Sequence, residues 1–231
     1  MKTLSLIVPV YNAPDLAARL ASRIPILSAA AEGCGFELVE ALFVDDGSKP
    51  PLSLPTCDPR ARVVRIEENR GKGHAVRAAA LASKGEWALM SDVDESAPLG
   101  EFTRLAAAAD GSWIVCGSRW KRPGVPFTRR ILSAIFRMVV RLAGVKGMHD
   151  SQCGFKLFRM DAMRPIFEAQ RIDRFAFDVE LILAVQRTGG VVAEVPVEWH
   201  GGRRSSLHVL RDAPKMLWDI IGLSRRLRRL N

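Results

Sequence analysis

The feature that most constrains this chain is a short apolar run that ends in two carboxylates. Residues Trp87 to Met90 are apolar, and Asp92 and Asp94 follow them closely. A bounded apolar run of this length is typical of a buried strand, and a carboxylate at its end must be paired or metal-bound. In extended backbone, the side chains of residues i and i+2 point the same way, roughly 7 Å apart. That spacing suits one shared Mg²⁺ or Mn²⁺ ion, although an isolated Asp-x-Asp is more often a solvated turn.

Apolar runs and helical patterns alternate through the first half of the chain. We expect strands at five places, namely Leu4–Val8, Phe36–Val44, Val63–Ile66, Trp87–Met90 and Trp113–Cys116. Helices are expected between them, from Pro14 to about Ala31, from Ala75 to Ser83 and from Pro98 to about Ala109. This alternation predicts an α/β fold with a Rossmann-like, mostly parallel sheet flanked by helices.

Charged residues follow three of the expected strands. They are Asp45 and Asp46 in an Asp-Asp-Gly-Ser turn, the pair Asp92 and Asp94, and Arg119 after Gly-Ser. Parallel strands bring such residues to one edge of the sheet, where open α/β folds bind ligands.

A glycine-rich loop, Arg70-Gly71-Lys72-Gly73, opens the helix expected from Ala75. Its backbone N–H groups are available to an anion. It lacks the Ser or Thr of a P-loop, and no G-x-G-x-x-G follows the first strand. The two common nucleotide fingerprints are therefore excluded, and a purely structural role for these glycines stays open.

The second half of the chain carries the positive charge. Arg119–Lys146 contributes +8 and Arg203–Asn231 contributes +6 to a net charge of +9, which leaves −5 on the remainder. We expect an amphipathic helix over Arg130–Ala143 and another from Pro214, packed on the core or lying on anionic lipid. An anionic partner is expected, either a membrane surface or a phosphorylated substrate. Few aromatics accompany the basic residues and no nucleic-acid motif is present, so nucleic acid is not expected.

The cysteine pattern and the hydropathy bear on location. The four cysteines are widely spaced without a C-x-x-C pair, which favours reduced thiols in the cytoplasm. We expect no signal peptide, because a strand pattern starts at the N-terminus. No apolar run approaches the roughly 18 residues of a membrane span. We therefore expect a cytoplasmic protein, peripherally associated with the inner face of the membrane.

The ordered set of motifs resembles a known family. Val8-Pro9-Val10-Tyr11-Asn12, Val44-Asp45-Asp46-Gly47-Ser48, the Arg-Gly-Lys-Gly loop and Asp92-Val93-Asp94 look like a family 2 glycosyltransferase of the GT-A type. The later segments Asp150–Phe158, Arg174–Leu181 and Glu194–Trp199 resemble dolichyl-phosphate β-glucosyltransferases. Polyprenyl-phosphate mannosyltransferases share the general plan.

The resemblance implies an activity and a division of the chain. One domain would span residues 1–231, with a nucleotide-sugar-binding half, 1–118, and an acceptor-binding half, 119–231. The reaction would be the inverting, metal-dependent transfer of a hexose, glucose from UDP-glucose, to a polyprenyl phosphate. The alternatives are a GDP-mannose-dependent mannosyltransferase, a family 2 enzyme with a non-polyprenyl acceptor, and an inactive scaffold of the same fold.

The resemblance also implies residue roles. The nucleotide-sugar donor would be held by Pro9, Tyr11, Asp45, Asp46, Lys72 and Asp92. Asp92 and Asp94 would bind Mg²⁺ or Mn²⁺. The acceptor phosphate would be held by Arg119, Arg129, Ser133 and Arg203.

A general base is optional for such an acceptor. A phosphate monoester has a second pKa of about 6 and is mostly ionised at neutral pH. If a carboxylate takes part in catalysis beside Arg119, Asp150 is the first candidate, followed by Asp178 and then Glu180. Each of the three is equally suited to a structural ion pair.

Overall fold

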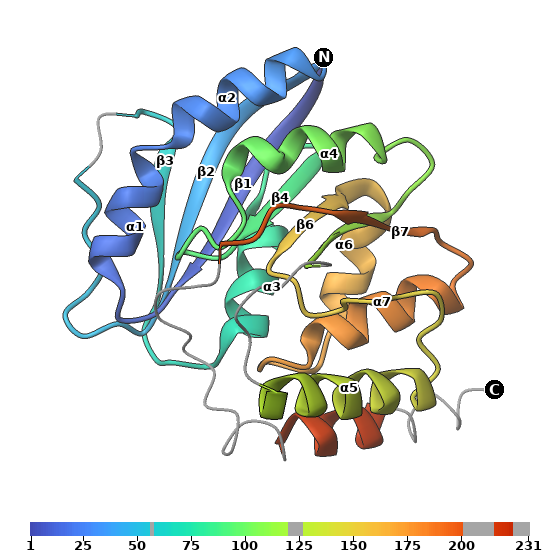
Figure 1. The fold of residues 1–231 in the computed structure, drawn as a ribbon. Helices are drawn as coiled ribbons and strands as arrows, with labels where there is room; N and C mark the ends of the chain where they lie inside the picture. Colours follow the sequence, from blue (N-terminus) through green and yellow to red (C-terminus); the bar gives the residue numbers. More distant parts are fainter. Residues whose placement is uncertain (56–57, 120–126, 201–214, 224–231) are drawn as a thin grey trace.

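A computed structural model of the chain contains one seven-stranded sheet with the order β3-β2-β1-β4-β6-β5-β7 (Figure 1). The structure describes residues 1–55, 58–119, 127–200 and 215–223, with the side chains of 127–133 left out. The strands are β1 (Lys2–Val10), β2 (Phe36–Asp46), β3 (Ala61–Ile66), β4 (Trp87–Ser91), β5 (Ile114–Ser118), β6 (Phe155–Arg159) and β7 (Val192–Pro196).

The sheet is mostly parallel, as the alternation predicts. β1 pairs in parallel with β2 and β4, β2 with β3, and β5 with β7. Only β6 runs the other way, between β4 and β5. The start of β6 therefore lies at the same edge as the ends of its neighbours, and this edge is called the carboxyl edge below.

Helices cover both faces of the sheet (Figure 1). One core layer is formed with α1 (Pro14–Ala21), α2 (Ile24–Gly33), η1 (Leu99–Glu101) and α4 (Phe102–Ala107). The other contains α3 (Lys72–Ala82), α5 (Phe127–Leu142), α6 (Met160–Ala169), α7 (Phe177–Arg187) and a helix over residues 215–223. Strand side chains alternate between the two layers, because successive residues of a strand point to opposite faces.

Two expectations about the first 35 residues are corrected. β1 does not stop before Pro9, which pairs with Val44 of β2. β1 pairs with β4 only as far as Ile7, so Pro9 lies where the strand has one neighbour and a proline is tolerated. The single helix expected from Pro14 is two helices, because the chain turns before Ile24 and Pro25 then occupies the first turn of α2.

Candidate functional site

The loops that follow β1 and β2 are tied together at the carboxyl edge. The backbone N–H of Asn12 donates to Ser48 Oγ at 2.9 Å, and that of Lys49 donates to Asn12 Oδ1 at 2.9 Å. Pro9 is partly buried at the end of β1, and Tyr11 beyond it is half exposed. The first strand therefore ends in a fixed loop that presents an accessible phenol ring.

Asp45 is fully buried, and its carboxylate holds the loop after β2. It accepts hydrogen bonds from the backbone N–H groups of Ser48 at 2.9 Å and Leu52 at 2.8 Å, and from the guanidinium of Arg65. Burial alone would raise the pKa of Asp45, but these donors hold it below its usual value. Asp45 thus stays ionised and shapes the Asp-Gly-Ser turn.

Asp46 holds the glycine-rich loop in the same way. Its two carboxylate oxygens accept the backbone N–H groups of Arg70 at 3.0 Å and Gly71 at 2.8 Å. Gly71 has φ +114°, and a Cβ there would lie 2.6 Å from the carbonyl oxygen of Asp173. Only glycine fits this position, so Asp46 and the loop form one preformed cradle at the start of α3.

The segment between α6 and α7 packs against the glycine-rich loop and helps to hold it in place. Gln170 Nε2 donates to the carbonyl oxygen of Gly73 at 3.0 Å, and Glu180 accepts the backbone N–H of Ile172 at 2.7 Å. Glu180 is one of the candidate bases expected from the sequence, whereas Gln170 is not among the expected residues. Their partners are backbone atoms, which leave no signal in the sequence.

Asp92 and Asp94 lie in a turn at the end of β4, not in the extended backbone expected from the sequence. The backbone N–H of Glu95 donates to the carbonyl oxygen of Asp92 at 3.0 Å, and Glu95 has φ +51°. Lys72 Nζ, from the first turn of α3, lies 2.6 Å from Asp92 Oδ1. The structure therefore brings Lys72, Asp92 and Asp94 together, and their expected roles in binding the donor and a metal stay predictions.

The chemistry of this turn fits a divalent cation. Burial and the neighbouring charge of Asp92 raise the pKa of Asp94. A cation between the two carboxylates would oppose both effects and favour the ionised form of Asp94. Across the described residues, no cluster of three or more His, Cys, Asp or Glu side chains is arranged to hold a metal. Mg²⁺ and Mn²⁺ commonly take one or two carboxylates and complete their shell with substrate phosphates and water.

Gly154 fixes the position of the Asp92 side chain. Its carbonyl oxygen accepts the backbone N–H of Asp92 at 3.1 Å, and a Cβ at Gly154 would lie 1.9 Å from Asp92 Oδ2. The residue that precedes β6 therefore packs directly against a candidate metal ligand. No role for this glycine is expected from the sequence alone.

Arg119 and Asp150 form a bidentate ion pair close to this turn. Arg119 Nε lies 2.6 Å from Asp150 Oδ2, and Nη2 lies 2.7 Å from Oδ1. Although burial opposes its charge, these bonds raise the pKa of Arg119 above its usual value, and the charge of Asp92 adds to the effect. Arg119 thus lies within electrostatic reach of the candidate metal site.

Asp178 forms a buried ion pair, which is the structural alternative left open for it in the sequence. It is 3% exposed, and Lys156, which is 1% exposed, lies 2.7 Å away. Burial opposes ionisation of this lysine, but Asp178 raises the pKa of Lys156 above its usual value. Asp178 and Lys156 thus form an ion pair in the core, next to the carboxyl edge.

Three expected acceptor contacts lie outside the described residues. Arg203 belongs to the segment 201–214. Arg129 and Ser133 belong to α5, but their side chains fall within 127–133. Their roles stay predictions.

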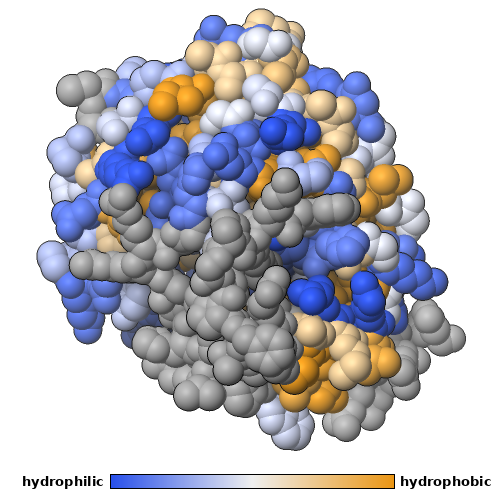
Figure 2. All heavy atoms as spheres, viewed as in Figure 1, coloured by the Kyte–Doolittle hydropathy of each residue, from blue (hydrophilic) through white to orange (hydrophobic). Residues whose placement is uncertain are grey.

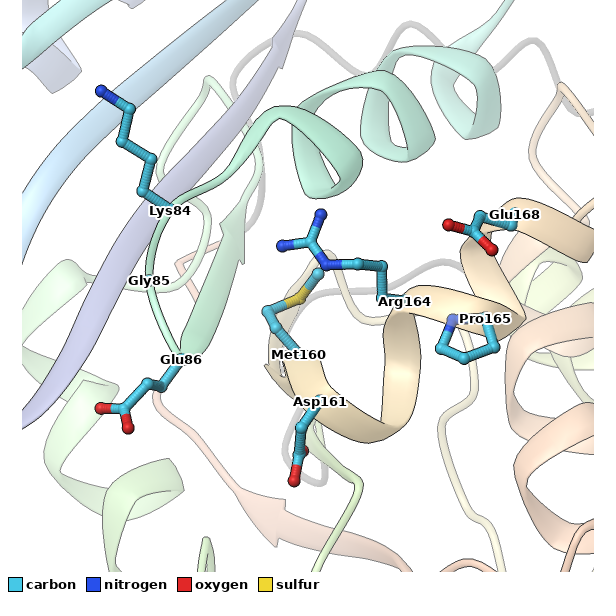
Figure 3. A pocket seen from close by; sticks show the side chains of 8 residues that line it. All are labelled: Lys84, Gly85, Glu86, Met160, Asp161, Arg164, Pro165 and Glu168. Carbon is cyan, nitrogen blue, oxygen red and sulfur yellow. The ribbon is translucent and has the colours of Figure 1, made fainter.

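A shallow pocket of about 350 Å³ lies at the opposite edge of the sheet, where β4 begins (Figure 3). Lys84, Glu86 and Arg164 are among its lining residues. Arg164 donates to the carbonyl oxygens of Leu81 at 2.9 Å and Ser83 at 3.1 Å, so it caps the end of α3. This pocket is separate from the site described above.

Comparisons with known proteins point to one family. The model of the family described as Glycosyl transferase family 2 matches residues 5–167. A dolichyl-phosphate beta-glucosyltransferase of Dictyostelium discoideum is 34% identical, over 94% of this chain and 72% of its own length. One of Homo sapiens is 32% identical, over 86% of this chain and 67% of its own length.

The fold comparison agrees with the expected GT-A architecture. Glucosyl-3-phosphoglycerate synthase of Mycobacterium tuberculosis, solved in complex with Mn²⁺, UDP-glucose and phosphoglyceric acid, superposes with a TM-score of 0.67. The alignment covers 96% of this chain and 78% of that protein, at 16% identity. This likeness concerns the fold.

Proposed function

The chain belongs to glycosyl transferase family 2, and from that premise we propose that this glycosyltransferase moves glucose from UDP-glucose to a polyprenyl phosphate of the dolichyl type. The names of the two relatives support the acceptor and the sugar. The observation that carries the proposal is that Arg119, directly after β5, and the turn with Asp92 and Asp94, directly after β4, lie on either side of the start of β6 at the carboxyl edge. A group that holds one phosphate thus adjoins a group suited to a metal-bound diphosphate.

The donor would bind at the preformed β1–β2–β4 part of the carboxyl edge. Asp92 and Asp94 would hold Mg²⁺ or Mn²⁺, which neutralises charge on the nucleoside diphosphate leaving group. Lys72, at the start of α3, would contact a phosphate oxygen. The base and ribose would lie against Pro9 and Tyr11.

Asp45 and Asp46 would contribute to donor binding mainly through loop shape. Both carboxylates are buried and already accept hydrogen bonds from backbone N–H groups. They hold the Asp-Gly-Ser turn and the glycine-rich loop in place before the donor arrives. Such preorganisation lowers the entropy lost on binding.

The acceptor phosphate would bind at Arg119, with Arg129, Ser133 and Arg203 as further expected contacts. A planar guanidinium suits a phosphate better than an ammonium does, because it can form two parallel hydrogen bonds. An ionised phosphate oxygen would attack the anomeric carbon from the face opposite the leaving diphosphate. This direct displacement inverts the configuration at that carbon.

The polyprenyl chain of such an acceptor would lie in a membrane. We therefore include peripheral membrane binding in the proposal. Ile135, Met138 and Leu142 of α5 are exposed, and so is Trp218 of the helix over 215–223. Figure 2 shows hydrophobic side chains gathered over α5, beside hydrophilic ones. Exposed apolar residues next to arginines are typical of helices that lie on anionic lipid. Within residues 1–55, 58–119, 127–200 and 215–223, no helix is long and apolar enough to cross a bilayer.

Isothermal titration would test the donor half. The purified protein and an Asp94→Ala variant would be titrated with UDP-glucose and GDP-mannose, with Mn²⁺ and with EDTA. We expect Mn²⁺-dependent binding of UDP-glucose that is lost in the variant and retained in Asp161→Ala, a change of an exposed carboxylate at the far edge. A preference for GDP-mannose would favour the mannosyltransferase alternative, and the absence of any metal-dependent binding would refute the enzyme proposal.

A transfer assay would test the acceptor half. Polyprenyl phosphate and diacylglycerol would compete for radiolabelled glucose, with the protein supplied alone or with anionic vesicles. We expect polyprenyl phosphate to be glucosylated and the protein to sediment with the vesicles. Preferential labelling of diacylglycerol would refute polyprenyl phosphate as the acceptor. Failure of the protein to sediment with the vesicles would refute the membrane association.

A further inference from the structure

We propose that Asp150 is a positioning residue, not a general base, and that it fixes the Arg119 guanidinium in the plane that receives the acceptor phosphate. The inference deepens the proposed function and depends on its acceptor being a phosphate. It assigns a role to a buried ion pair that the displacement reaction itself does not require. The contacts of Asp150 carry it.

Hydrogen bonds from Arg119 and Gln152 occupy the Asp150 carboxylate. Oδ2 accepts Arg119 Nε at 2.6 Å and the Arg119 backbone N–H at 3.2 Å. Oδ1 accepts Arg119 Nη2 at 2.7 Å and the Gln152 backbone N–H at 3.2 Å. A carboxylate offers about four lone-pair positions. A group with its acceptor positions filled by an arginine and two backbone amides is poorly placed to take a proton from a substrate.

The loop that carries Asp150 is itself held in place. Glu194, at β7, accepts the backbone N–H groups of His149 at 2.8 Å and Asp150 at 2.7 Å. Asp150 is 7% exposed, so the pair is largely shielded from water. The backbone around Asp150 therefore cannot shift without breaking its bonds to Glu194 of β7.

The guanidinium of Arg119 is held on a second side by an aromatic ring. Its central carbon lies 5.9 Å from the centroid of the Trp199 ring, which is within the range of cation–π attraction. Asp150 occupies the Nε side of the guanidinium. Because the five N–H groups form a planar fork, the Nη1 side then faces away from Asp150. We assign that side to the acceptor phosphate.

This arrangement explains why an arginine stands here with a buried carboxylate partner. A long side chain loses rotamer entropy when a substrate orders it, and Asp150 removes that loss by ordering it beforehand. Since Arg119 follows β5 and Asp92 follows β4, on either side of the start of β6, the orientation of Arg119 sets where the acceptor oxygen stands relative to the donor.

Kinetics of Asp150→Asn would separate the two roles. Asparagine keeps the shape and one acceptor oxygen but loses the charge. If Asp150 positions Arg119, the acceptor KM rises about tenfold or more, while the pH dependence of kcat and the donor affinity stay as in the wild type. If Asp150 is the base, kcat falls by about a hundredfold or more and the acidic limb of its pH profile disappears, which would overturn the proposal.

A double-mutant cycle supplies the second readout. In an Arg119→Lys background the bidentate contact is already lost, so adding Asp150→Asn should raise the acceptor KM little further. The effects of the two substitutions on acceptor KM should therefore be strongly non-additive. Additive effects on acceptor KM would overturn the proposal. This cycle stays informative even if Asp150→Asn lowers the stability of the fold, because both arms are measured at a temperature where all variants are folded.

Asp58→Asn provides a matched control. Asp58 forms the same bidentate contact with Arg60, Nε–Oδ1 at 2.9 Å and Nη2–Oδ2 at 2.8 Å, just before β3 begins at the far edge of the sheet. We expect its acceptor KM to equal that of the wild type. A wild-type protein that transfers no glucose to polyprenyl phosphate would refute the proposed function instead, which the donor titration and transfer assay detect independently.

Discussion

The two ends of the carboxyl edge hold their charges by different means. At the β1–β2 end, the buried carboxylates of Asp45 and Asp46 accept hydrogen bonds mainly from backbone N–H groups of nearby loops, with Arg65 as an additional partner of Asp45. At the β5–β6 end, buried carboxylates pair with cationic side chains, Asp150 with Arg119 and Asp178 with Lys156. The first arrangement fixes loop shape, whereas the second fixes the orientation of cations. The difference is consistent with the proposal that the donor binds at the first end and the acceptor phosphate at the second.

Breaking an ion pair at the β5–β6 end should have the largest effect. Lys156→Met leaves the Asp178 carboxylate buried without its cation, and we expect the free energy of unfolding to fall by about 3–5 kcal/mol. Urea denaturation at neutral pH would measure it.

The double variant Lys156→Met with Asp178→Leu is the control for that experiment. Replacing both partners by apolar groups removes the uncompensated charge, so most of the lost stability should return. A Lys156→Met variant that unfolds at the wild-type urea concentration would show that the two ends do not differ in this way.

Substituting Gly154, which lies where the two ends of the carboxyl edge meet, should have the next largest effect. Gly154→Ala places a Cβ against Asp92 Oδ2, so the carboxylate must move. We expect turnover to fall about a hundredfold together with weaker donor binding, measured by transfer kinetics and titration with UDP-glucose.

Gly33→Ala is the matched control, because a Cβ at the end of α2 meets no heavy atom within 4 Å. It should leave both measurements unchanged. Unaltered donor binding in Gly154→Ala would mean that the β5–β6 end does not hold the donor site in place.

The smallest effect is expected at the β1–β2 end. Asp45→Asn weakens the charge-assisted bonds to two backbone amides and Arg65, and we expect a loss of about 1–2 kcal/mol. Chemical denaturation at neutral pH would measure this loss. Asp110→Asn, a change in an exposed pair with Lys2, should show no measurable loss.

The effect of Asp45 should depend on pH in a defined direction. Its pKa in the folded state lies below the ordinary value of 3.8. The stabilisation is therefore fully present above pH 3.8 and is lost as the pH falls through the folded-state pKa. The stabilities of wild type and Asp45→Asn should approach each other in acid, and a constant difference at all pH values would contradict this assignment.

Local patterns predicted the parallel part of the fold well. The strands from β1 to β5 were expected within a few residues, because each is an apolar run bounded by turn residues. No element was assigned over β6, where Lys156 interrupts the apolar pattern at a buried position. Its partner Asp178 is distant in the sequence, and no local pattern reveals such a pair.

The candidate site was predicted in composition but not in geometry. Lys72, Asp92 and Asp94 are neighbours in the structure, but the two aspartates lie in a turn, since Glu95 adopts a positive φ that its sequence does not signal. Asp150 was the first candidate base, and its bidentate contact with Arg119 became visible only in the structure. Residues that act through backbone atoms, such as Gln170, left no trace at all.

The reversed direction of β6 has a consequence for how the chain acquires its fold during synthesis. β5 precedes β6 in the sequence, but in the sheet it pairs only with β6 and β7. A nascent chain released only as far as Ser118 would therefore hold β5 with no strand to join, and β4 would present an open edge. Such an edge is prone to pair with other chains. Emergence of Phe155–Arg159 from the ribosome would close it, so the segment next to Asp92 also completes the assembly of the sheet.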